Sequence, residues 1–60
     1  MTNTDWLKQQ NLSLSPKQAE KFNAEVSIEY AYSLNVGKPA DVEVLRQQIL
    51  KGVLQWKSTP

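Results

Sequence analysis

The sequence predicts an all-α fold, a small three-helix domain in which a short first helix precedes an antiparallel pair of long helices. Apolar side chains in two long segments recur every three or four residues, which is the spacing of one helix face. A proline stands near the start of each long segment, where the first turn of a helix accepts it. The residues Asn35, Val36 and Gly37 separate the segments with a typical helix stop. At 60 residues the chain is expected to form one domain, residues 1–60.

The first helix is expected over residues 5–10. Thr4 is a suitable N-cap, and the carboxylate of Asp5 is favourable near the positive end of the helix dipole. The segment offers only two apolar side chains, Trp6 and Leu7. Because so short a helix is marginal in water, Trp6 is expected to pack against another surface that holds the helix in place.

The second helix has the clearest start signal in the chain, after a linker at residues 11–14. Ser15 is a good N-cap, Pro16 fits the first helical position, and Gln18 completes a capping box. We expect this helix to span residues 16–34.

The second helix carries apolar side chains on two nearly opposite sides. The first face consists of Phe22, Val26, Tyr30 and Leu34. The second, called the Tyr32 face below, consists of Ala24, Ile28 and Tyr32. A helix with two apolar faces needs two neighbours to bury them. The last helix is expected to cover the first face, while the Tyr32 face is either covered by the first helix or free to bind another chain.

The third helix is expected over residues 39–57, with Pro39 at its first position and Asp41 in its first turn. Its apolar stripe consists of Val42, Leu45, Ile49, Val53 and Trp56. Gly52 lies on the same stripe, which indicates either close approach of another helix or an early end of this one. The expected core consists mainly of Phe22, Val26, Tyr30, Val42, Leu45, Ile49 and Val53.

The composition argues against catalysis and against metal or cofactor binding. The chain has no cysteine and no histidine, so it lacks disulfides and the usual thiolate and imidazole ligands. Glu25 and Glu29 are the only close carboxylate pair on a helix, and we expect them to be solvated. A chain this short leaves little room for a closed pocket. We therefore expect no enzyme, no catalytic residue, no metal, no cofactor and no small-molecule substrate.

The location is expected to be cytoplasmic. No segment approaches the roughly 18 apolar residues needed to span a bilayer, and the start of the chain lacks the layout of a secretion signal. For the same reason we expect no membrane partner. Met1 and the absence of a tag suggest a complete short protein.

The leading functional hypothesis is a small protein-binding regulator of the inhibitor or antitoxin kind. It would bind a partner protein, or a second copy of itself, through the Tyr32 face, with Trp6 and Trp56 at the edges of that surface. Tyrosine and tryptophan are enriched at interfaces because they bring large contact areas at low entropy cost. A structural subunit of a larger assembly would show the same sequence features.

A small dimeric DNA-binding regulator is the alternative hypothesis. Two helices joined by a short turn are similar to a helix-turn-helix, and the last helix offers Arg46, Gln47 and Lys51 for bases and phosphates. Seven basic and six acidic residues nearly cancel, however, and Asp41 and Glu43 would bring carboxylates towards phosphates. Nucleic acid therefore ranks below protein as the expected partner.

One stretch of the chain is similar to the helix that follows the inhibitory segment in small antitoxins of Fic-type AMP-transferases. The similar residues are Pro39, Leu45, Ile49, Gly52 and Leu54. The inhibitory motif of that family places glutamate four residues after serine or threonine. Ser27 would need glutamate at position 31, where Ala31 stands, and no other Ser or Thr fits. The chain is therefore not assigned to that family.

Overall fold

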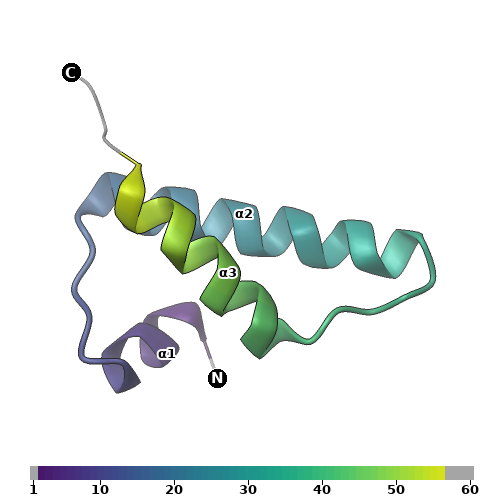
Figure 1. Cartoon of the computed structure of the whole chain (residues 1–60), viewed down its shortest axis with the longest axis horizontal. Coiled ribbons are helices and arrows are strands. Elements are labelled where there is room, and N and C mark those ends of the chain that lie inside the picture. The colour runs from purple at the N-terminus through teal and green to yellow at the C-terminus, as the bar shows by residue number, and fades with distance from the viewer. Residues whose placement is uncertain (1, 57–60) are drawn as a thin grey trace.

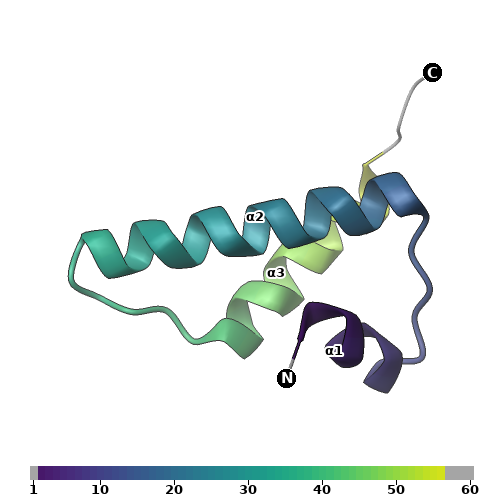
Figure 2. The same ribbon diagram turned by 180° about the vertical axis from the view of Figure 1, so that it is seen from behind.

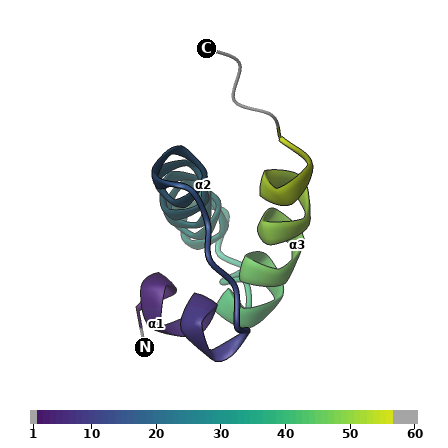
Figure 3. The ribbon, with the colours of Figure 1, turned by 90° about the vertical axis from the view of Figure 1, so that its left-hand side faces the viewer.

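The computed structural model describes residues 2–56, and these form three helices and no strand: α1 (Asn3–Gln9), α2 (Pro16–Asn35) and α3 (Val42–Gln55). This confirms the predicted all-α, three-helix class. In Figure 1, α3 runs obliquely back across the first half of α2, and α1 lies below that half of α2. Viewed end-on, the three helices occupy the corners of a triangle (Figure 3).

Helix α1 begins two residues earlier than expected. Thr2, not Thr4, is the N-cap, and its hydroxyl accepts a hydrogen bond from the Asp5 backbone N–H at 3.1 Å. Both threonines have the same capping chemistry, so the local sequence did not distinguish them. After Gln9 the chain turns through Asn11, which has a φ of 57°. This left-handed residue ends the helix and directs the chain towards α2.

Helix α2 starts as the sequence predicts and ends one residue later. The Ser15 hydroxyl accepts from the Gln18 backbone N–H, and the Gln18 side chain accepts from the Ser15 backbone N–H, both at 3.2 Å. Gly37 supplies the left-handed stop, with a φ of 77°. The backbone N–H of Lys38 then donates to the carbonyl of Ser33 at 3.0 Å, which closes the helix end.

Helix α3 begins three residues later than expected. The prediction that Pro39 opens the helix is wrong, because Asp41 is the N-cap and its carboxylate accepts from the Glu43 backbone N–H at 2.9 Å. Ser33 holds the preceding segment in place: its hydroxyl accepts from the Ala40 N–H at 3.1 Å. The expected end at residue 57 lies outside the described residues, within which α3 ends at Gln55.

The core takes two side chains from each helix. Its members are Trp6 and Leu7 from α1, Phe22 and Val26 from α2, and Leu50 and Val53 from α3. Of the seven expected core residues, three are buried: Phe22, Val26 and Val53. The other four, Tyr30, Val42, Leu45 and Ile49, are only half-buried, and Ile49 packs against the core. Leu50 is buried instead because α3 packs against α1 as well as α2. The contact with α1 turns the buried face of α3 away from the expected apolar stripe.

Candidate protein-binding surface

The Tyr32 face is exposed to solvent. Ile28 is 64% exposed and Tyr32 is 61% exposed, and Ala24 on the same side is also exposed. The cause is that α1 and α3 both pack on the opposite side of α2, where Phe22 and Val26 are buried. The C-terminal part of α2 also projects beyond both neighbouring helices, as the view from behind shows (Figure 2). Within the described residues, α1 therefore does not cover this face.

Trp6 does not lie at the edge of this surface. It is only 2% exposed, and its ring stacks on that of Phe22 with centroids 6.0 Å apart. Its indole N–H donates to the Glu43 carboxylate at 3.3 Å, which ties α1 to α3. Trp6 thus docks, as expected, but in the core of its own chain. This corrects its assignment as a partner-binding residue, because a side chain buried in the core does not present a surface.

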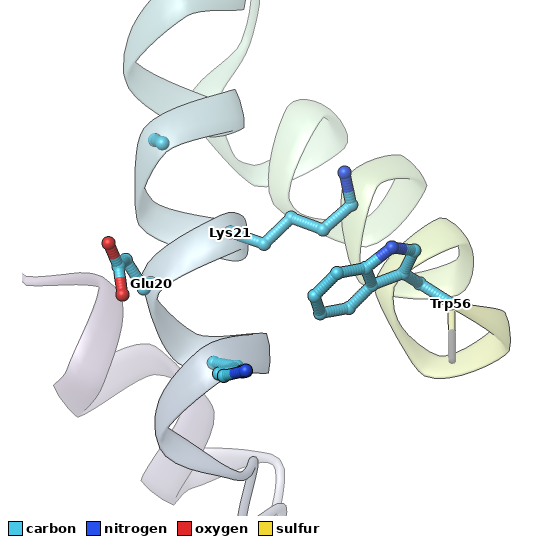
Figure 4. A pocket seen from close by; sticks show the side chains of 5 residues that line it. Glu20, Lys21 and Trp56 are labelled. Carbon is cyan, nitrogen blue, oxygen red and sulfur yellow. The ribbon is translucent and has the colours of Figure 1, made fainter. Parts of the chain in front are cut away.

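Trp56 does lie near the Tyr32 face. It is half-buried at the end of α3, and the Lys21 ammonium of α2 lies 5.2 Å from its ring centroid (Figure 4). The same ammonium pairs with the Glu25 carboxylate at 3.0 Å. An open hollow of about 390 Å³ is lined by Lys17, Glu20, Lys21, Ala24 and Trp56. Ala24 and Trp56, two of the predicted partner-binding residues, therefore border one concave surface.

The three residues expected to contact nucleic acid do not form one surface. Arg46 is buried, and its guanidinium N–H donates to the Asn3 side chain at 2.8 Å. Asn3 in turn donates to Asn23 at 2.9 Å, so it connects α1 to both long helices. Gln47 and Lys51 remain exposed. The burial of Arg46 corrects its place in the predicted nucleic-acid set, since it positions α1.

Gly52 is not a point of close helix approach within this chain. It is exposed, and a methyl group added to its Cα would meet no atom within 4 Å. Gly52 is followed by three further helical residues, so it does not end α3 either.

Two residues of α2 have surroundings that their sequence pattern did not indicate. Leu34 was placed on the buried side of α2 but is half exposed, because each four-residue step along a helix rotates by about 40° and three steps carry it off the face. Lys21 was not singled out, although it joins α2 to Trp56 across the hollow. The sequence offered one signal for Lys21: it stands four residues before Glu25, the spacing of an ion pair on one helix face.

Neither a metal-ligand cluster nor a membrane-spanning helix is found among residues 2–56. No group of three or more acidic, histidine or cysteine side chains lies close enough to hold a metal ion, and Glu25 is engaged by Lys21. No helix in this part of the chain has the length and apolar character to cross a membrane. Comparison with protein-family models, with curated proteins and with solved structures finds no match to the chain.

Proposed function

We propose that this protein acts by binding another protein chain through the Tyr32 face, as a small regulator of the inhibitor or antitoxin kind. The observation that supports this proposal is the high exposure of Ile28 and Tyr32 on one face of α2. Single exposed apolar residues are ordinary on protein surfaces. Ile28 and Tyr32, however, are two large ones a single helical turn apart, and Ala24, one turn before Ile28, borders the hollow that Trp56 lines. Clustered exposed apolar side chains of this kind are typical of surfaces that partners cover.

The energetics favour association at this surface. Burying an isoleucine or tyrosine side chain of this size contributes about 1.5–3 kcal/mol. Tyrosine and tryptophan are also the residue types that most often dominate binding energy. The helix that carries them is fixed at both ends by capping interactions, so little backbone order has to be gained on binding.

Binding to nucleic acid is less well supported. Of the three residues expected to contact DNA, Arg46 is engaged with α1 and only Gln47 and Lys51 face solvent. Arg46 and Lys51 are the basic residues of α3, so Lys51 is the exposed cation of this helix.

Affinity capture from an extract of the source cells tests the proposed function. The bait is the native chain, and the test variant is Ile28→Ala/Tyr32→Ala. Leu54→Ala is the matched control, since Leu54 is a 52% exposed apolar residue on another helix. We expect the native chain and the control to retain a protein, either a different one or further copies of this chain, that the double variant loses. Equal retention by all three would overturn the proposal.

A further inference from the structure

We draw no further inference here: the strongest candidate, the exposed patch of Ile28 and Tyr32 on α2 with the open hollow between Ala24 and Trp56 beside it, belongs to the surface already described, and nothing in the structure shows what covers it.

Discussion

At the scale of single residues, the two glycines have opposite roles and predict opposite effects of the same substitution. Gly52 is an exposed residue in α3 with open space around its Cα, so Gly52→Ala should raise the free energy of unfolding by about 0.5–1 kcal/mol. Gly37 has a φ of 77°, a left-handed conformation that a side chain makes unfavourable. Gly37→Ala should therefore lower the free energy of unfolding by about 1–2 kcal/mol. Urea denaturation followed by circular dichroism measures both. A loss of stability in Gly52→Ala would contradict the open surroundings of that residue.

Trp6 is the residue on which the position of α1 depends most. Truncating a buried tryptophan costs about 3–5 kcal/mol, which is comparable to the whole stability of a core this small. Trp6→Ala should therefore be largely unfolded, with weak helical circular dichroism at room temperature. The half-buried Trp56 provides the comparison: Trp56→Ala should keep its helical signal. If Trp6→Ala stays folded with an unchanged melting temperature, the central position of Trp6 is wrong.

Residues were predictable from sequence where their environment is local. Trp6 was expected to dock because α1 is too short to be stable alone, but the sequence did not show that its site is the interior beside Phe22. Arg46 looked like a solvent-facing residue because it is charged, precedes Gln47 and Gln48, and stands outside the expected apolar stripe. Its burial follows from the contact with Asn3, which lies 43 positions away in the chain. A contact of that range leaves no periodic signal in a single sequence.

At the scale of elements, the connection between α2 and α3 depends on one hydroxyl group. The Ser33 side chain donates to the Tyr30 carbonyl at 2.7 Å and accepts from the Ala40 N–H at 3.1 Å. Ser33→Ala leaves that N–H without its partner and should lower the free energy of unfolding by about 1–3 kcal/mol. Ser27→Ala is the control, because Ser27 is exposed on the same helix and its loss should be nearly neutral. Equal effects of the two variants in thermal denaturation would rule out the role of Ser33.

The same connection explains why α2 was predicted better than α3. The capping box of Ser15 and Gln18 and the stop at Gly37 involve residues within a few positions of each other, so the sequence displays them completely. At the start of α3, Pro39 and Asp41 gave two competing local signals. Asp41 is the N-cap, and beside it the Ala40 N–H donates a hydrogen bond to the Ser33 hydroxyl of the preceding helix. The prediction of the Tyr32 face as a separate apolar surface depended on which side of α2 the other helices occupy, and only the packing decided that.

At the scale of the whole molecule, the three helices share one core and therefore stabilise one another. Each contributes two buried side chains, and α1 adds polar ties to both long helices through Asn3 and Trp6. This arrangement covers the inner side of α2 around Phe22 and Val26. It leaves the Tyr32 face of the same helix on the outside, so binding there requires no rearrangement of the core.

The shared core predicts that α1 detaches only when the long helices unfold. In a Trp56→Phe variant, Trp6 is the only tryptophan, and its fluorescence reports the burial of α1. Far-ultraviolet circular dichroism reports mainly α2 and α3, which contain most of the helical residues. Because Trp6 stacks directly on Phe22, removing α1 opens the core of the long pair, and the two signals should change at the same urea concentration. A fluorescence transition that precedes the loss of circular dichroism would mean that α1 is a separate, weakly attached unit.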